Sequence, residues 1–521
     1  MLRINNIKVP VGKTNYKHIL SQTLNIREKY LHKVELVKLS VDARRDKIFW
    51  ICSLTFEVEN EERLLKQYPQ LVKVEPYEYH YLPKNDREVI VVGSGPAGLF
   101  CAYVLAQVGQ KVTVIERGQV IEQRVKDVDD LMNKGILHPE SNIAFGEGGA
   151  GTFSDGKLTT GIKNHRLRYI LETFVEYGAP QDILYLSMPH IGTDYLRKVI
   201  VNMRKAMEEK GVRFLFGTQM LSFEKHEDHF DVLVQIDYQQ QKLHCHDLVL
   251  AIGHSARDTY EMLYEKGLEI QQKGFAVGVR IEQSQAMINQ IQYKKHASSP
   301  FLKAAPYKLA VQTKEKRGVY TFCMCPGGVV VPSHHEDGTL CVNGMSYYKR
   351  DGDNANSAIL VNVLPSDFSS DHPLAGIEFQ RILEKKAYEL GESSMKAPVQ
   401  LVNDYINNQQ SYQLGQIKPT YMPGYVLANI NELFPEFLNR NLKEGLLLMN
   451  QKMKGFIDED TIITGVEARS SAPVRLLRNE KYQSNIKHLY PIGEGAGYAG
   501  GIMSAAVDGI MCAEMILKEG D

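Results

Sequence analysis

The chain has 521 residues, of which 43% are hydrophobic and 24% charged, and its formal net charge is −1. This length is too great for a single compact core and indicates about two to four domains, while the composition excludes a disordered or fibrous protein. The near-neutral charge argues against a large nucleic-acid-binding surface, which needs a clustered basic face.

The N-terminal sequence MLRINNIKVP is polar and charged where a signal peptide has an apolar core. We therefore expect a cytoplasmic protein without a membrane segment. The seven cysteines include no CxxC pair, which suits a reducing compartment and gives no disulfide framework.

Residues 1–84 predict a separate small α+β domain. The pattern indicates a strand over 2–9, a helix over 16–30, two strands over 34–41 and 47–59 around a turn at 42–46, a short helix, and a last strand over 72–79. This β-α-β-β-α-β order is typical of a ferredoxin-like unit. The segment LPKNDRE is the predicted linker.

Residues 89–118, VIVVGSGPAGLFCAYVLAQVGQKVTVIERG, predict a strand, a glycine turn, a helix and a second strand. Gly93 allows the tight turn, Gly95 lets backbone amides approach a pyrophosphate, and Gly98 lets the helix pack closely on the sheet. Glu116 follows the second strand, where it can accept hydrogen bonds from ribose hydroxyls. The pattern in this context indicates a dinucleotide site of the Rossmann type.

The dinucleotide-binding domain is interrupted in the predicted organisation. We expect its first part over residues 85–273, with strands at 212–225, 230–237 and 242–253, and its last part over 462–521. Residues 274–461 predict an inserted α+β substrate domain that covers the cofactor. The fold class is therefore α/β: a three-layer Rossmann-like dinucleotide-binding fold with this insertion and the N-terminal domain.

The C-terminal segment, residues 488–518, points to FAD rather than to a nicotinamide. It predicts a strand, a glycine-rich turn and an apolar helix, and such an element supplies the second contact that an FAD site needs at the ribityl chain and flavin ring. A helix that begins near Gly501 would direct its positive end at the flavin, where reduction builds negative charge. Many flavoproteins carry Asp where this chain has Glu494.

Several further segments narrow the assignment, among them FGEGGAGTFSDGKL, LAIGHSARD, FCMCPGG, VNGMS, GVEARSSAPVR and YPIGEGAGYAGGI. Together with the glycine motifs, they resemble the bacterial FAD-dependent, or NAD(FAD)-utilising, dehydrogenase family of the glutathione-reductase-type flavoprotein superfamily. The resemblance covers essentially the whole chain. It implies a redox activity and FAD bound by Gly93, Ser94, Gly95, Pro96, Ala97, Gly98, Glu116, Arg117, Arg124, Gly149, Thr152, Ser154, Met220, Ala251, Gly253, Gly493, Glu494, Gly500, Gly501 and Ile502.

The resemblance also implies individual roles. The amides around Ser94 would bind the pyrophosphate, Arg117 and Arg124 would lie beside the adenine or the phosphates, and Met220 would contact the adenine through main-chain atoms. No second GxGxxG follows a strand. NAD(P)H, if it is the transient reductant, must therefore enter the same pocket as the small-molecule substrate.

Hydride transfer at a flavin is mainly the cofactor's chemistry, so the protein needs to position the substrate and move one proton. The candidate catalytic residues are Lys157, His254, Arg469 and Arg475. Two arginines suit a carboxylate substrate because a guanidinium binds carboxylate through paired hydrogen bonds. The alternatives are a solvated lysine, a helix-capping histidine and arginines in interdomain ion pairs.

No metal site is predicted. Cys323 and Cys325 share one face of a predicted strand, where two cysteines are more often buried than redox-active. The histidines at 334–335, and those at positions 226, 229, 244 and 246, lack the regular spacing of metal ligands.

Two alternatives remain open beside an FAD-dependent oxidoreductase. One is a flavin-containing RNA-modification or macromolecule-binding scaffold, because residues 1–84 hold 15 Lys/Arg against 10 Asp/Glu, a local excess of +5. The other is an NAD-only dehydrogenase, which would make the C-terminal glycine segment incidental. The substrate and the oligomeric state do not follow from the sequence.

Overall fold

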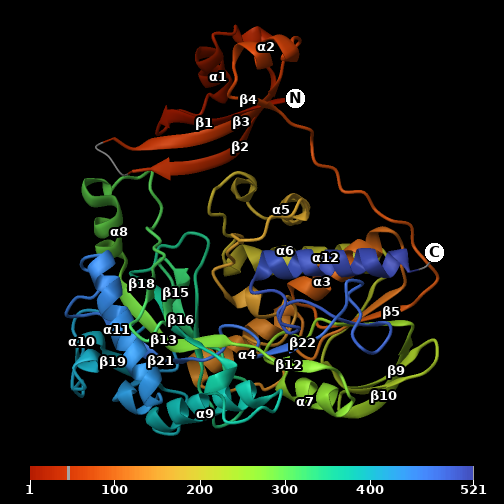
Figure 1. Ribbon diagram of the computed structural model, residues 1–521, viewed down its shortest axis with the longest axis vertical. Coiled ribbons are helices and arrows are strands. Elements are labelled where there is room, and N and C mark those ends of the chain that lie inside the picture. The colour runs from red at the N-terminus through yellow and green to blue at the C-terminus, as the bar shows by residue number, and fades with distance from the viewer. Residues whose placement is uncertain (44–46, 520–521) are drawn as a thin grey trace.

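The computed structural model describes residues 1–43 and 47–519 and contains three parts (Figure 1). A small N-terminal domain lies above two larger ones, each built around its own sheet. The predicted turn at 42–46 falls largely outside the described residues. None of the described helices combines the length and the apolar character needed to cross a membrane.

The N-terminal domain has the predicted β-α-β-β-α-β order, and its sheet has the strand order β2-β3-β1-β4. The first helix is shorter than predicted because Asn25 adopts a left-handed conformation (φ 47°) and ends it at Leu24. The elements are β1 (Leu2–Pro10), α1 (Tyr16–Leu24), the 3₁₀ turn η1 (Glu28–Tyr30), β2 (His32–Asp42), β3 (Phe49–Glu57), α2 (Glu61–Gln67) and β4 (Leu71–Lys73).

The second part is built on a five-stranded parallel sheet with the order β23-β11-β5-β6-β7. Its central strand alternates: Val89 and Val91 face one hydrophobic cluster, and Ile90 and Val92 face another. Both faces of the sheet are therefore covered, and the sheet is the middle one of three layers. The strands are β5 (Val89–Val92), β6 (Val112–Ile115), β7 (Arg213–Leu215), β11 (Asp247–Leu250) and β23 (Leu489–Pro491).

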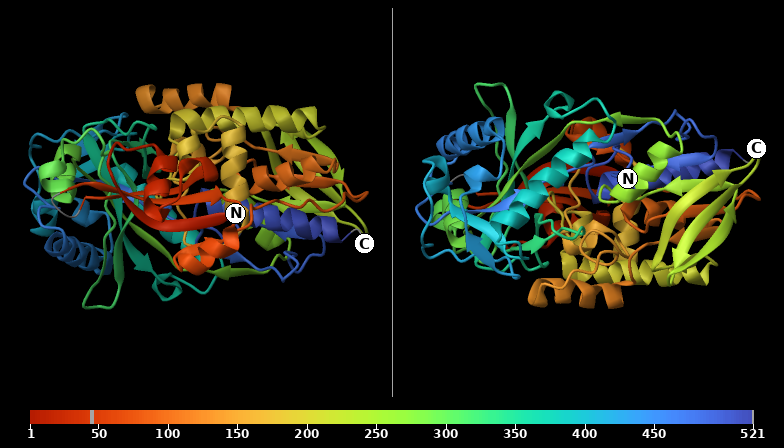
Figure 2. Two further views of the ribbon diagram at one scale, coloured as in Figure 1. Left: turned by 90° about the horizontal axis from the view of Figure 1, so that it is seen from above. Right: turned by 90° about the horizontal axis from the view of Figure 1, so that it is seen from below.

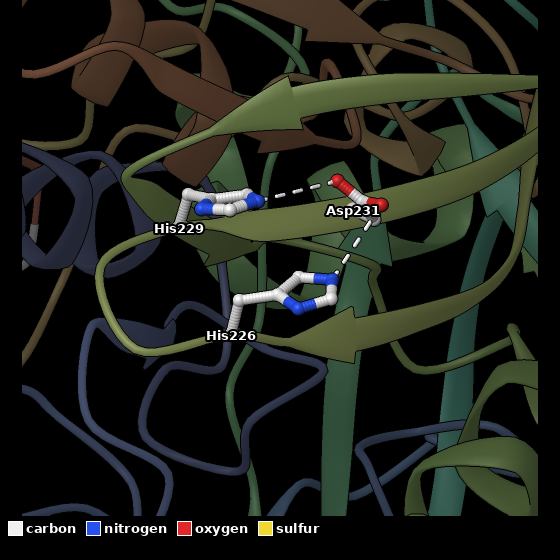
Figure 3. Close-up of side chains that lie close together, drawn as sticks. All are labelled: His226, His229 and Asp231. Carbon is white, nitrogen blue, oxygen red and sulfur yellow. Dashed lines mark ion pairs between the residues drawn. The ribbon is translucent and has the colours of Figure 1, made fainter.

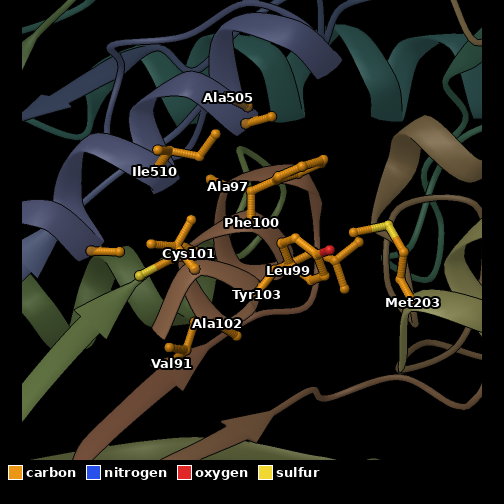
Figure 4. Packing of buried hydrophobic residues seen from close by; sticks show 14 of the residues in the cluster. Val91, Ala97, Leu99, Phe100, Cys101, Ala102, Tyr103, Met203, Ala505 and Ile510 are labelled. Atoms are coloured by element: carbon orange, nitrogen blue, oxygen red, sulfur yellow. The ribbon is translucent and has the colours of Figure 1, made fainter. Parts of the chain in front are cut away.

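Helices cover the first face of this sheet. The helix that follows the glycine turn packs against the C-terminal helix (Figure 4), so elements about 400 positions apart in the sequence share one core. The helices of this part are α3 (Pro96–Gln107), α4 (Ile121–Lys134), α5 (Arg166–Glu176), α6 (Thr193–Glu209), α7 (Arg257–Glu265) and α12 (Ile502–Lys518).

A three-stranded antiparallel sheet covers the second face, made of β8 (Thr218–Lys225), β9 (Phe230–Ile236) and β10 (Gln239–Cys245). Two of the strands predicted here are each divided in the structure. Gly217, at φ 58°, separates β7 from β8, and the chain crosses from β10 to β11 at His246. In both places the first and second halves belong to different layers.

The third part contains a seven-stranded mixed sheet with the order β14-β15-β18-β13-β21-β19-β20. Its strand β21 (Ile462–Glu467) pairs with β13 and β19, so the predicted boundary after Thr461 falls one strand too early. The other strands are β13 (Phe275–Ser284), β14 (Ala310–Gln312), β15 (Gly318–Cys325), β18 (Asn354–Val363), β19 (Ala397–Leu401) and β20 (Tyr425–Leu427).

Helices and short strand pairs complete this part and join it to the parallel sheet. The helices are α8 (Gln285–Tyr293), α9 (Ala375–Leu390), α10 (Val402–Ile406) and α11 (Glu436–Lys452). The two-stranded pairs are β12 (Ile270–Gln272) with β22 (Val474–Leu476), and β16 (Val329–Pro332) with β17 (Val342–Met345).

The N-terminal domain contacts both larger parts, and a view from above places it across their junction (Figure 2). Leu39 of β2 forms a parallel bridge with Leu186, and its carbonyl accepts a hydrogen bond from the Ser187 amide at 2.9 Å. On the other side, a β-carbon at Gly12 would lie 3.4 Å from the Phe301 ring.

Candidate active site

The first glycine turn has the geometry that the sequence predicts. Gly93 adopts φ 101°, and a β-carbon there would lie 2.4 Å from the carbonyl oxygen of Ala251. A β-carbon at Gly98 would lie 2.0 Å from the Gly93 carbonyl oxygen, so α3 could not pack on β5 with any side chain there. A β-carbon at Gly95 would lie 3.8 Å from its nearest neighbour, the Gly149 α-carbon, so this side of the Gly95 backbone is open.

The C-terminal segment meets this turn directly. A β-carbon at Gly493 would lie 2.7 Å from the Ala97 side chain, and one at Gly509 would lie 2.0 Å from the Ala97 carbonyl oxygen. The Gly493 amide donates to Asp508 at 2.7 Å, which holds the turn before α12. Both glycine segments therefore form one site.

The first turns of two helices converge on Gly151. A β-carbon at that position would lie 3.1 Å from Ile502, the first residue of α12, and 4.0 Å from Pro96, the first residue of α3. Gly500 and Gly501 have open space where their side chains would be. Helix N-termini carry partial positive charge and unpaired N–H groups, so this cradle suits a phosphate or an electron-rich ring.

Glu116 lies where the sequence places it, at the end of β6, and it is buried. One carboxylate oxygen accepts from the amide and hydroxyl of Ser94 at 2.9 and 2.8 Å, and the other accepts from the amides of Gly118 and Gly146 at 3.0 Å each. Because a carboxylate has about four acceptor positions, a ribose hydroxyl would displace one of these donors. Its contact with ribose stays a prediction.

Arg124 organises the loop that follows α4 and is fully buried. Burial lowers its pKa to about 10, so it stays charged at neutral pH. Its role in the structure differs from the predicted contact with adenine or phosphate, because its guanidinium donates to the backbone carbonyls of Asn142, Ile143, Gly146, Glu147 and Gly149.

Arg117 is also engaged by protein groups. Its guanidinium pairs with Glu140 at 2.6 Å and with Asp258 at 2.9 Å, and it stacks over the Phe145 ring. Its predicted contact with the cofactor stays untested, as does that of Met220, whose side chain is buried between the parallel sheet and β8–β10.

The loop at 149–157 runs from the cradle to the third part of the molecule. Gly149 packs against Gly95, and the Thr152 carbonyl accepts from Thr193 at 2.7 Å. The Ser154 hydroxyl donates to the Gly151 carbonyl at 2.6 Å. These internal bonds fix the loop beside the first turn of α3.

Lys157 ends this loop and joins it to β15, where its ammonium donates to the Met324 carbonyl. Its Nζ also lies 3.4 Å from Asp155, which is buried and bonded to Arg350 and Ser346. Burial raises the pKa of Asp155, but Lys157 and Arg350 outweigh it and hold that pKa well below its usual value. Lys157 thus bridges two domains with a third of its side chain exposed.

Cys323 and Cys325 do not share one environment, contrary to the sequence prediction. A register shift separates Phe322 from Cys325 in β15, Cys323 adopts φ 42°, and its side chain is exposed while Cys325 is buried. Among the described cysteines, Cys323 alone is exposed. Arg280 holds this strand by donating to the Cys323 carbonyl at 2.6 Å.

His254 and Glu494, both predicted from sequence, lie together. The His254 Nδ1 atom is 3.4 Å from a Glu494 carboxylate oxygen. The buried Tyr260 hydroxyl donates to the carbonyls of Gly253 and Gly495 at 3.1 and 2.7 Å, which holds the two strand ends side by side.

Arg469 and Arg475 do not form a paired carboxylate clamp. Arg469 is buried and binds Glu384 at 2.7 and 2.8 Å, and it also contacts His335. Arg475 lies on β22 and stacks over the Tyr498 ring at 5.2 Å. For Arg469, the structure supports the alternative of an ion pair within the protein, with Glu384 of α9.

Sequence patterns missed the charged residues that support this site. Asp155 lies inside a glycine-rich segment that the sequence singled out, and its position two residues before Lys157 was the available signal. Glu384 and Arg280 lie inside an ordinary helix and an ordinary strand, where local patterns give no sign of their partners.

Two family models match the chain. One describes an FAD binding domain and matches residues 88–124, and the other describes an FAD-dependent protein, C-terminal domain-like, and matches residues 274–470. A protein of Clostridium beijerinckii whose function is not characterised is 43% identical over 531 residues, which cover 100% of this chain and 99% of that protein. The chain belongs to the same family as this clostridial protein.

The FAD binding domain model covers the first glycine turn of this chain, at Gly93 to Gly98. The chain is an FAD-binding flavoprotein, and the NAD-only alternative is wrong because the matched domain is an FAD binding domain. The residues fit the cofactor: two helix N-termini meet at one point, and open space lies beside Gly500 and Gly501.

Two further likenesses are partial or distant. The ribosomal RNA dihydrouridine synthase of Haemophilus influenzae is 27% identical over 169 residues, which cover 32% of this chain and 40% of that protein. A flavoprotein/dehydrogenase from Cytophaga hutchinsonii is 12% identical with a TM-score of 0.35, over 83% of this chain and 78% of that chain. Neither likeness assigns an activity.

Proposed function

We propose that this flavoprotein is an oxidoreductase that passes hydride between a small-molecule substrate and N5 of bound FAD. The convergence of α3 and α12 on Gly151 carries this proposal, because helix N-termini suit both a pyrophosphate and an electron-rich ring. FAD supplies the two-electron chemistry when it is bound. The protein's own contribution is to bind, to orient and to exclude water.

The loop at 149–157 gives the substrate its place in this proposal. It begins against the α3 turn and ends at Lys157, beside the exposed Cys323 of β15. A substrate between this loop and β15 would meet an ammonium group whose charge Asp155 partly balances. Such a group favours a substrate with an anionic or carbonyl oxygen. His254 remains a second proton-carrying candidate beside Glu494.

An anaerobic reduction assay tests the proposal. We expect NADH or NADPH to bleach the flavin absorbance of the purified protein, because no separate nicotinamide domain follows from the sequence and the reductant must reach the flavin directly. A panel of carbonyl and unsaturated metabolites should then restore the oxidised spectrum. The proposal is contradicted if neither nucleotide reduces the flavin and no metabolite reduces it when supplied as the electron donor.

A second candidate function is flavin-dependent modification of RNA. The matched Haemophilus protein is a ribosomal RNA dihydrouridine synthase, and the N-terminal domain, which we assign to the ferredoxin-like type, carries a local charge excess of +5. This domain lies across the junction of the two larger parts, where it could hold a macromolecular substrate (Figure 2).

Deletion of residues 1–73, which end with β4, separates the two functions. The N-terminal domain has its own hydrophobic core, and the retained Tyr79 and Leu82 stay packed against the core of the parallel-sheet part. If the small-molecule reaction is the function, nucleotide-dependent flavin reduction and reoxidation by the metabolite persist after the deletion. If RNA is the substrate, reduced flavin is reoxidised by ribosomal RNA in the full chain only.

A further inference from the structure

Four side chains form a cluster on one outer face of the β8–β10 sheet: His226, His229, Asp231 and His244. Their spacing along the sequence does not predict this cluster. The His226 amide donates to the His229 carbonyl at 2.9 Å and closes the β8–β9 hairpin, so these residues face each other. Asp231 lies two positions after His229 and therefore on the same face, and it pairs with His244 of β10.

The two hairpin histidines point toward one carboxylate (Figure 3). The Nε2 atoms of His226 and His229 lie 3.5 and 3.6 Å from the two oxygens of Asp231. The candidate ligand atoms of these three residues all lie within 4.8 Å of one another. Ligands about 2.0–2.1 Å from a tetrahedral metal are roughly 3.4 Å apart, so the observed spacing suits one ion.

Hydrogen bonds from neighbouring side chains orient these candidate ligands. The Asp228 carboxylate lies 2.7 Å from Nδ1 of His229, which favours a proton on Nδ1 and leaves Nε2 free to donate its lone pair. His244 Nδ1 lies 2.6 Å from Asp231 and orients that carboxylate.

Lys242 is the competing cation on this face. Its Nζ lies 3.8 Å from Asp231 and 3.7 Å from Glu224. It is exposed and long, so it can turn to Glu224 alone when a metal takes Asp231.

We propose that His226, His229 and Asp231 bind one divalent transition metal ion of the zinc class, with water as the remaining ligand. Two imidazoles and a carboxylate match the donor preference of zinc and its neighbours in the first transition row. The ion would join the two ends of the β8–β9 turn to the start of β9. This site lies on the layer opposite α3 and α12, so it is independent of the FAD cradle.

Calorimetric titration of the FAD-loaded full chain with zinc chloride, after treatment with a chelator, tests the site. We expect one ion per chain and a loss of affinity of at least about tenfold in His226→Gln and in His229→Gln, because each removes one ligand. Both residues lie near the surface, so the variants should fold. The Asp228→Asn variant should weaken binding about tenfold through the His229 ring.

The matched control is His18→Gln, which removes a surface histidine that is likewise paired with a carboxylate, Glu28 at 2.8 Å. This variant should bind zinc as the wild type does. FAD content, measured on the same samples, should not change in any variant. Absence of zinc binding to the wild type, or equal affinity in the wild type and both ligand variants, would overturn the proposal.

Discussion

Replacing Gly501 by leucine should abolish FAD binding without unfolding the protein. Gly501 has an extended backbone (φ 170°), which any residue can adopt, and no atom lies within 4 Å of the place where its β-carbon would be. The β-carbon therefore has room, and in the proposed site the cofactor competes with the rest of the side chain for the open space. We expect FAD affinity to fall at least 100-fold, or about 2.7 kcal/mol, in a fluorescence titration.

The control for this substitution is Gly161→Leu. Gly161 is exposed, has equal room for a β-carbon, and lies outside the predicted cofactor contacts. It should bind FAD as tightly as the wild type. The apoproteins of both variants should unfold at the wild-type temperature. Tight FAD binding by the Gly501 variant would show that α12 does not hold the flavin end.

Replacing Glu384 by glutamine should cause the largest loss of stability. Glu384 is completely buried between Arg257 and Arg469, with N–O distances of 2.7 to 3.0 Å. The substitution removes the carboxylate charge that Arg469 and Arg257 share and leaves Arg257 paired only with the partly exposed Glu336. Removing one partner of a buried ion pair costs about 3–5 kcal/mol, and we expect an effect of this size.

The single tryptophan separates this effect from unfolding of the N-terminal domain. Trp50 lies in β3, so its fluorescence reports that domain, while far-UV circular dichroism and flavin release report the other two. The urea midpoint should fall by circular dichroism and stay unchanged by tryptophan fluorescence. Glu336→Gln is the control, because Glu336 contacts Arg257 from a partly exposed position and should cost much less.

The same residue gives a dependence of stability on pH. Although burial acts to raise the pKa of Glu384, Arg257 and Arg469 lower it to about 2 from an ordinary value of 4.5. The ionised form therefore stabilises the fold fully above pH 4.5, and this contribution of about 3 kcal/mol is lost as pH falls toward 2. Over that range the difference in free energy of unfolding between the wild type and Glu384→Gln should decrease toward zero. A constant gap would contradict the assignment.

Local patterns were sufficient for the elements that form the cofactor cradle. The pattern of apolar residues and the backbone conformations open to glycine predict the strand, turn and helix around Gly93. The strand and helix around Gly501 are predicted in the same way. The N-terminal element order was also predictable, apart from the early end of α1 at Asn25.

Long-range pairing was not predictable from such patterns. The sequence predicts one strand over 212–225, yet its halves β7 and β8 are edge strands of two different sheets. Likewise, Arg469 and Glu384 are separated by 85 positions, and only the packing of α9 on β19 and β21 brings them together. The histidines gathered by the β8–β9 hairpin are a third case.

The content of FAD in the purified protein tests the central claim most directly. Release of cofactor by denaturation, followed by chromatographic identification, should give one FAD per chain, with the native protein showing flavin absorbance that bleaches on reduction. A colourless protein that takes up no FAD on incubation would contradict the assignment of the cradle formed by α3, Gly151 and α12.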